Sequence, residues 1–268
     1  PRGNGVIDTR HGKTKKISYE TRPGPGVEKL ILLHAIGTDR SLWDDVAADW
    51  AGLGTLVLCD LPGHGSAPDP SGAPTMFELA DSVVEMMDAE GIDAAHVVGI
   101  SLGGMIGLAL AVRHPGRVAS LVAADARVDA PEDYRRMWDG LIATAEDEGM
   151  GPIAAFMGAR WFGTDPAAHP PGAGRIIASL TATRPAGFVA AARAIQGLDF
   201  EAALDTISCP TLLAVGANDG ALPAKMKQLS TLVPGCGFVE IAGAGHLPAI
   251  DNPAAFGHAV ASFIARPR

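Results

Sequence analysis

This chain has only one short basic run, Lys13 to Lys16, no even set of cysteines and no long apolar run, and each of these lacks argues against a class of protein. Phosphate binding requires clustered cations, so a formal net charge of −9 argues against a nucleic-acid surface. No uninterrupted run of about 18 apolar residues occurs, and therefore no membrane span is expected. No Cys/His cluster has the spacing of metal ligands, and no Gly-x-Gly-x-x-Gly motif opens the first strand–helix unit. Neither a metal nor a nucleotide cofactor is therefore expected.

Only three cysteines are present, Cys59, Cys209 and Cys236, and each lies in or beside an apolar run. An odd number in this setting predicts free thiols of a reduced protein rather than a disulfide scaffold. The first residues show no charged-then-apolar signal-peptide pattern, which together with the free thiols favours a cytoplasmic location. Aromatic residues make up only 5% of the chain, whereas the 33 glycines predict tight turns and close backbone approaches.

What the chain does contain is an alternation of apolar runs with helical patterns. The apolar runs predict strands at residues 5–9, 16–21, 29–34, 55–61, 96–100, 118–124, 211–216 and 237–241. The helical patterns between the later runs cover residues 76–89, 102–114, 225–232 and 253–264. This alternation predicts one α/β core with a mostly parallel sheet and helices on both faces. The first two strands, joined through His11-Gly12, are expected to pair antiparallel at one edge of the sheet.

One long segment interrupts the alternation. Residues 127–204 contain no strand run, but they contain helical patterns at 131–148, 152–161, 172–183 and 186–196. We therefore predict a helical cap, residues 127–204, inserted into a core formed by residues 1–126 and 205–268. No internal repeat is evident.

The strongest chemical signal is the sequence Gly99-Ile100-Ser101-Leu102-Gly103-Gly104. It follows a predicted strand and opens a predicted helix, which is the setting that a nucleophile elbow requires. A side chain at Gly99 or Gly103 would crowd the sharp turn, and the helix behind Ser101 adds a positive dipole near developing negative charge. The sequence therefore predicts Ser101 as a nucleophile; a helix-capping serine in a glycine-rich turn is the alternative.

A serine hydroxyl is a weak nucleophile and needs a base, which an acid in turn orients. His246 lies in a loop directly after the last predicted strand, where open α/β sheets bind ligands. Asp219 follows the strand at 211–216, so the order along the chain is serine, acid, histidine. Asp125 is the alternative acid, because it follows the strand at 118–124. Asp219 could also merely form the turn, beside Asn218 and Gly220.

An oxyanion hole needs two backbone N–H donors. One is expected from Leu102, the residue after the nucleophile. The other is expected from the loop after the strand at 29–34, with Ile36 as the first choice and Ala35 as the alternative.

Together these residues resemble the α/β-hydrolase superfamily across essentially the whole chain. Within it the sequence looks most like the 3-oxoadipate enol-lactonases of aromatic catabolism. The segments that carry this resemblance are the elbow with Met105, Gly37-Thr38-Asp39, Trp43-Asp44, Met137-Trp138-Asp139 and Thr183-Arg184-Pro185-Ala186-Gly187. The chain departs from that family at His34-Ala35, where small polar residues are frequent.

The resemblance implies a serine hydrolase that opens a lactone, or cleaves a carboxylic ester, through an acyl-enzyme. It also implies that Arg184 pairs with a substrate carboxylate and that Trp138 forms a wall of the pocket. A solvated charge and an ordinary core tryptophan are the alternatives for these two residues. A general carboxylesterase, a C–C bond hydrolase with the same triad, and a ligand receptor on the same fold are the rival functions. The expected partner is a small-molecule ester or lactone, and the oligomeric state stays open.

Overall fold

A computed structural model describes residues 9–266, which form an eight-stranded sheet covered by helices. The strands are β1 (Arg10–Lys13), β2 (Ser18–Arg22), β3 (Lys29–Leu33), β4 (Thr55–Asp60), β5 (Ala95–Ile100), β6 (Val118–Ala124), β7 (Thr211–Gly216) and β8 (Gly237–Ile241). Their order in the sheet is β1-β2-β4-β3-β5-β6-β7-β8, and all pairs from β4 to β8 are parallel. Every residue of β4, β5 and β7 is buried, which explains why these strands are continuous apolar runs.

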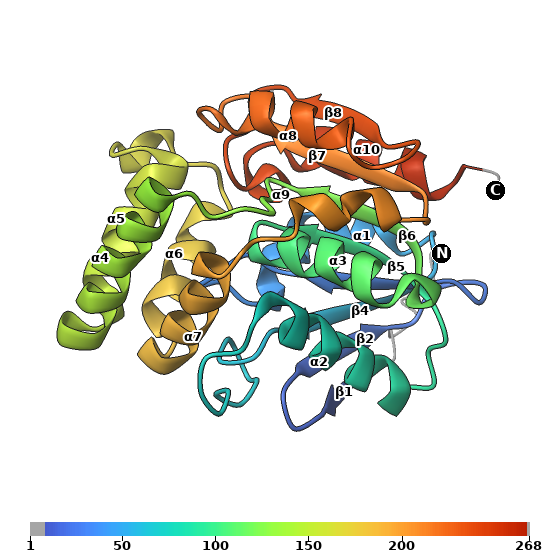
Figure 1. Ribbon diagram of the computed structural model, residues 1–268, viewed down its shortest axis with the longest axis horizontal. Coiled ribbons are helices and arrows are strands. Elements are labelled where there is room, and N and C mark those ends of the chain that lie inside the picture. The colour runs from blue at the N-terminus through green and yellow to red at the C-terminus, as the bar shows by residue number, and fades with distance from the viewer. Residues whose placement is uncertain (1–8, 267–268) are drawn as a thin grey trace, which may run out of the picture.

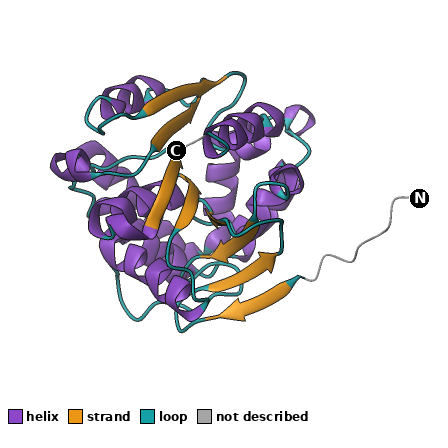
Figure 2. Ribbon diagram, turned by 90° about the vertical axis from the view of Figure 1, so that its right-hand side faces the viewer, coloured by secondary structure: helices purple, strands orange, loops and turns teal. Residues whose placement is uncertain are grey.

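Helices cover both faces of this sheet (Figures 1 and 2). Those of the core are α1 (Asp44–Trp50), α2 (Met76–Ala89), α3 (Leu102–Arg113), α8 (Leu222–Ser230), α9 (Pro248–Asp251) and α10 (Pro253–Ile264). In Figure 1, α2 and α3 lie in front of the sheet, whereas α1, which packs against α10, lies behind it. A capping box between Thr75 and Glu78 starts α2 at the predicted residue. No helix within residues 9–266 is long and apolar enough to cross a membrane.

The amino-terminal edge of the sheet differs from the prediction. The strand expected at 5–9 lies almost entirely outside the described residues, and β1 occupies 10–13, where we expected the turn at His11-Gly12. Gly12 pairs with Tyr19 across β1 and β2, and a Cβ atom at Gly12 would lie 2.1 Å from the Tyr19 ring. This glycine makes room for an aromatic ring across the strands, so reading it as a turn residue was wrong. The antiparallel pairing at this edge is confirmed.

Four α-helices lie between β6 and β7 and gather on one side of the molecule (Figure 1). They are α4 (Glu132–Glu148), α5 (Met150–Phe162), α6 (Ala173–Ala182) and α7 (Pro185–Gln196). The chain enters and leaves this segment side by side. The Ala130 N–H donates to the Leu198 carbonyl, the Phe200 N–H donates to the Val128 carbonyl, and Asp129 and Asp199 form an antiparallel bridge. The two crossings therefore form a narrow, hydrogen-bonded neck.

Candidate active site

Ser101 stands on a strained turn between β5 and α3. Its φ is +54°, a backbone conformation that a residue with a side chain rarely adopts. Two glycines permit the turn, because a Cβ at Gly99 would lie 2.2 Å from the Gly103 carbonyl oxygen and one at Gly103 would lie 1.9 Å from the Leu33 carbonyl oxygen. The turn places the serine at the amino end of α3, where helix dipoles favour negative charge.

His246 and Asp219 lie next to this serine, on loops that follow β8 and β7. The Ser101 hydroxyl donates to His246 Nε2 at 3.0 Å, and His246 Nδ1–H donates to Asp219 Oδ2 at 2.6 Å. Because a carboxylate only accepts, the Asp219 contact assigns the proton to Nδ1 and leaves Nε2 free to accept from the serine. The structure thus brings the predicted nucleophile, base and acid into one hydrogen-bonded chain.

The electrostatics of the acid agree with a charged Asp219. Burial opposes the charge, but the hydrogen bond from His246, with help from the nearby positive charge of Arg160, holds the pKa of Asp219 below its ordinary value. The Trp161 ring of α5 lies over the His246 ring, with centroids 5.9 Å apart and planes 17° apart. The alternative acid, Asp125, also lies close by, but it accepts the Gly216 N–H at 2.9 Å and does not bond His246 within the described chain.

Two backbone N–H groups are available for an oxyanion. Within residues 9–266, neither the Ile36 nor the Leu102 N–H has a hydrogen-bond acceptor, and Ile36 lines the same cavity as Ser101. A turn shapes the Ile36 loop, because the Thr38 N–H donates to the Ala35 carbonyl and Gly37 has a φ of +72°. The Thr183 hydroxyl of the cap donates to the Gly37 carbonyl at 2.9 Å, which ties this loop to the cap.

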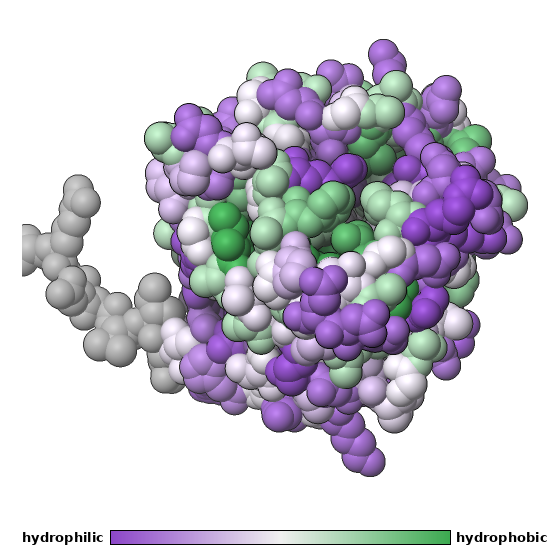
Figure 3. Space-filling model, turned by 90° about the vertical axis from the view of Figure 1, so that its left-hand side faces the viewer, coloured by the Kyte–Doolittle hydropathy of each residue, from purple (hydrophilic) through white to green (hydrophobic). Residues whose placement is uncertain are grey.

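A cavity of about 40 Å³ adjoins Ser101 and is roofed by the cap. Trp138 lies in its wall, as predicted, and is 4% exposed. The other lining residues include Tyr134, Met137, Leu141, Phe156, Met157, Arg160 and Trp161. Figure 3 shows that the face bearing the cap is hollowed, with hydrophobic residues at the bottom of the hollow and hydrophilic ones around it.

The arginine that lines this cavity is Arg160 and not the predicted Arg184. Arg184 donates to Asp69 at 2.6 Å, to the Gly65 carbonyl at 3.1 Å and to the Ala67 carbonyl, so its guanidinium is occupied by that loop. Among the described residues that line the Ser101 cavity, Arg160 is present and Arg184 is not. No hydrogen bond or ion pair within the described chain engages the Arg160 guanidinium. No signal in the sequence distinguishes Arg160, because its position near the end of a cap helix is that of any exposed helical charge.

Comparisons with known proteins agree with this arrangement. A family model described as "alpha/beta hydrolase fold" matches residues 29–253. A 3-oxoadipate enol-lactonase of Acinetobacter baylyi is 27% identical, covering 97% of this chain and 96% of its own. A pimeloyl acyl-carrier-protein methyl ester esterase of Neisseria meningitidis is 32% identical, covering 89% of this chain and 94% of its own. The crystal structure of an enol-lactonase from Burkholderia xenovorans superimposes with a TM-score of 0.87 at 26% identity, covering 96% of this chain and all of that one.

Proposed function

Because the chain belongs to the alpha/beta hydrolase fold family, we propose that it is a serine hydrolase that cleaves carboxylic ester or lactone bonds through an acyl-enzyme on Ser101. The single observation that carries the proposal is the chain of two hydrogen bonds from Ser101 through His246 to Asp219. These groups stand at the ends of β5, β8 and β7, the edge where open α/β sheets bind their ligands. The esterase and lactonase relatives support the same reaction class.

In the first half-reaction, His246 Nε2 accepts the Ser101 proton while the serine oxygen attacks the substrate carbonyl. The carbonyl oxygen gains negative charge, which the N–H groups of Ile36 and Leu102 would receive. The protonated His246 then gives its proton to the leaving oxygen. Asp219 stabilises the imidazolium and keeps the ring in the required tautomer.

In the second half-reaction, water takes the place of the leaving group. His246 removes a proton from the water, which attacks the acyl carbonyl in the same oxyanion hole. The acid is released and the proton returns to Ser101. For an enol lactone the first half-reaction is favoured further, because the departing enol collapses to a ketone.

The preferred acyl group carries a carboxylate. The support is Arg160, whose guanidinium forms no hydrogen bond or ion pair with the described residues and lies in a cavity whose other walls are mostly apolar. A guanidinium binds a carboxylate through charge-assisted hydrogen bonds. Such a substrate fits a lactonase that resembles the 3-oxoadipate enol-lactonases. The methyl ester esterase relative, at higher identity over less of the chain, favours an open-chain ester as the second candidate.

Replacement of the nucleophile tests the proposal. Ser101→Ala should abolish p-nitrophenyl acetate hydrolysis and labelling by a fluorophosphonate, with unchanged circular dichroism. Ser66→Ala, a serine on the loop between β4 and α2, is the control that should keep both activities. Full hydrolysis by Ser101→Ala would end the serine mechanism. Steady-state rates on a carboxylated enol lactone and on a methyl ester of similar length then separate the two candidates.

A further inference from the structure

The mechanism described above leaves one group beside the triad unused, the carboxyl of Asp125. This residue follows β6, between the strands that carry Ser101 and Asp219. It is fully buried, and its φ is +48°. Of the non-glycine residues in the described chain, only Ser101 and Asp125 have a positive φ. Backbone strain of this kind persists where the surrounding structure holds it, and it concentrates at functional sites.

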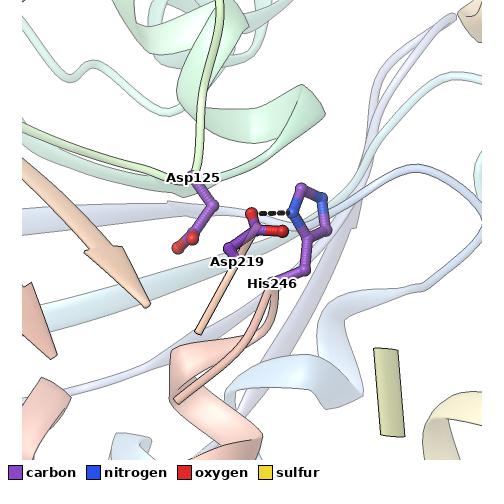
Figure 4. Close-up of side chains that lie close together, drawn as sticks. All are labelled: Asp125, Asp219 and His246. Carbon is purple, nitrogen blue, oxygen red and sulfur yellow. Dashed lines mark hydrogen bonds and ion pairs between the residues drawn. The ribbon is translucent and has the colours of Figure 1, made fainter. Parts of the chain in front are cut away.

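The two oxygens of this carboxyl have different surroundings. Oδ1 accepts the Gly216 N–H at 2.9 Å. Oδ2 is buried, and no donor from residues 9–266 reaches it. Three side chains meet here, because one carboxylate oxygen each of Asp125 and Asp219 and a ring nitrogen of His246 lie within 4.8 Å of one another. Figure 4 shows the Asp219 carboxylate between the other two side chains. The Asp125 carboxyl therefore has a negatively charged group, the Asp219 carboxylate, for a neighbour.

Two ionised carboxylates cannot share such a buried place without a cation between them. The charged or titratable groups around Asp125 are Asp219, His246, Asp251, Arg127, Tyr134, Arg160 and Lys225. Arg127 and Lys225 both pair with Asp129, at 3.4 and 2.6 Å, and within residues 9–266 no cation, Arg160 included, forms an ion pair with Asp125. His246 gives its Nδ1 proton to Asp219. A proton on Asp125 itself resolves the conflict.

We propose that Asp125 is a neutral carboxylic acid and that its O–H donates a hydrogen bond to the Asp219 carboxylate. The triad then continues to a fourth residue, in the order Ser101, His246, Asp219, Asp125. Asp125 touches no substrate; it is a positioning residue that holds the Asp219 carboxylate where it meets His246. Burial, and then the negative charge of Asp219, raise the pKa of Asp125 well above its ordinary value, in agreement with this arrangement. The inference rests on the proposed function, because it concerns the residue that orients the proposed base.

Asparagine at position 125 reproduces the proposed hydrogen bonds without a titratable proton. Its carbonyl oxygen can accept from Gly216 and its amide nitrogen can donate to Asp219, as the O–H of a neutral acid would. Asp125→Asn is therefore the conservative variant, and Asp125→Ala, which removes both contacts, is the disruptive one. Asp147→Asn, an exposed aspartate of α4, is the matched control for the loss of one acidic side chain.

Difference infrared spectroscopy at neutral pH decides the protonation state directly. In the spectrum of the wild type minus that of Asp125→Asn, the positive bands should include the C=O stretch of a protonated acid. In the same difference for Asp147→Asn, the positive side-chain bands should be those of a carboxylate. A carboxylate band in the Asp125 difference would overturn the proposal. Because Asn has the same size and shape, this measurement does not depend on the alanine variant folding.

Kinetics then test the positioning role. Asp125→Ala should lower kcat for p-nitrophenyl acetate by about tenfold or more with little change in KM, since a hydrogen bond to a charged acceptor is lost away from the substrate. Asparagine should restore most of that kcat. If the folded asparagine variant is as slow as alanine, or if KM rather than kcat changes, the hydrogen bond from Asp125 has no positioning role.

Labelling of Ser101 keeps the two proposals separate. If a fluorophosphonate fails to label Ser101 in the wild type, the proposed function fails, whatever the infrared spectra show. If Ser101 is labelled and the Asp125 spectrum contains a carboxylate band, only the inference about Asp125 fails.

Discussion

Arg160 gives the sharpest test of substrate choice. It lies on α5 and lines the cavity at Ser101, yet its side chain is also exposed to solvent. A charge-assisted hydrogen bond is worth about 1.5–3 kcal/mol, and an exposed ion pair about 0–1 kcal/mol. Arg160 lines a cavity and is also exposed, so its contact with a substrate carboxylate should fall between these two cases and contribute about 1–2 kcal/mol to binding. Arg160→Gln should then lower kcat/KM for an anionic ester roughly fivefold to thirtyfold.

The assay compares two esters with the same leaving group. p-Nitrophenyl hemisuccinate carries a carboxylate at the end of its acyl chain, and p-nitrophenyl valerate carries a methyl group at a similar distance. Arg160→Gln should reduce kcat/KM for the first ester and leave the second within about twofold, because the loss is of a charge contact. Added salt should shrink the difference in the wild type.

Arg184→Gln is the matched control. The Arg184 guanidinium bonds the loop at residues 65–69, so its loss should lower thermal stability without changing the ratio of the two rates. Removal of Arg160, whose guanidinium forms no hydrogen bond or ion pair with the described residues, should leave thermal stability nearly unchanged. An unchanged ratio in Arg160→Gln, or an equal change in both variants, would refute the assignment of Arg160.

Two further predictions concern the support of the site. In a urea titration, Gly103→Ala should lower the free energy of unfolding by about 1–3 kcal/mol, because the new Cβ would meet the Leu33 carbonyl oxygen. The control is Gly140→Ala on α4, where a new Cβ would have nothing within 4 Å. This variant should raise the free energy of unfolding by about 0.5–1 kcal/mol. Asp39 accepts from the Ser41 N–H and the Ser179 hydroxyl, and although burial opposes its charge, these bonds hold the pKa of Asp39 below its ordinary value. Its carboxylate therefore stabilises the fold above about pH 4 and loses that effect as pH falls through the lowered pKa, so the stability gap between wild type and Asp39→Asn should narrow in acid. A gap that widens in acid would contradict this sign.

The sequence predicted the parallel core well because burial leaves a direct mark on composition. Strands covered on both faces must be apolar throughout, and β6 and β7 begin and end at the predicted residues. The approach of Ser101 to His246 was predictable because each residue follows a predicted strand at the edge where open sheets bind ligands.

The cap residues were harder to predict, because helical periodicity does not say which neighbour a helix end will meet. Arg160 and Arg184 both lie near ends of cap helices, and only tertiary packing decides that one faces the cavity and the other the loop at 65–69. The strand β1 was missed for a related reason. Glycine is frequent in turns, which favoured a turn at Gly12. Its role depends instead on Tyr19, which is seven residues away along the chain and directly opposite in the sheet.

The narrow neck between Val128 and Phe200 has a consequence for how such proteins diversify. Both ends of the inserted segment leave the core at one point, held by the hydrogen bonds between Ala130 and Leu198 and between Phe200 and Val128. A segment with adjacent ends can be lengthened, shortened or exchanged with little strain on the scaffold around it. Ser101, Asp219 and His246 lie outside this segment, whereas Trp138, Arg160 and Trp161 lie within it. Evolution, or an engineer grafting the segment from a relative, can thus replace the residues that line the cavity while the hydrogen-bonded chain of Ser101, His246 and Asp219 stays intact.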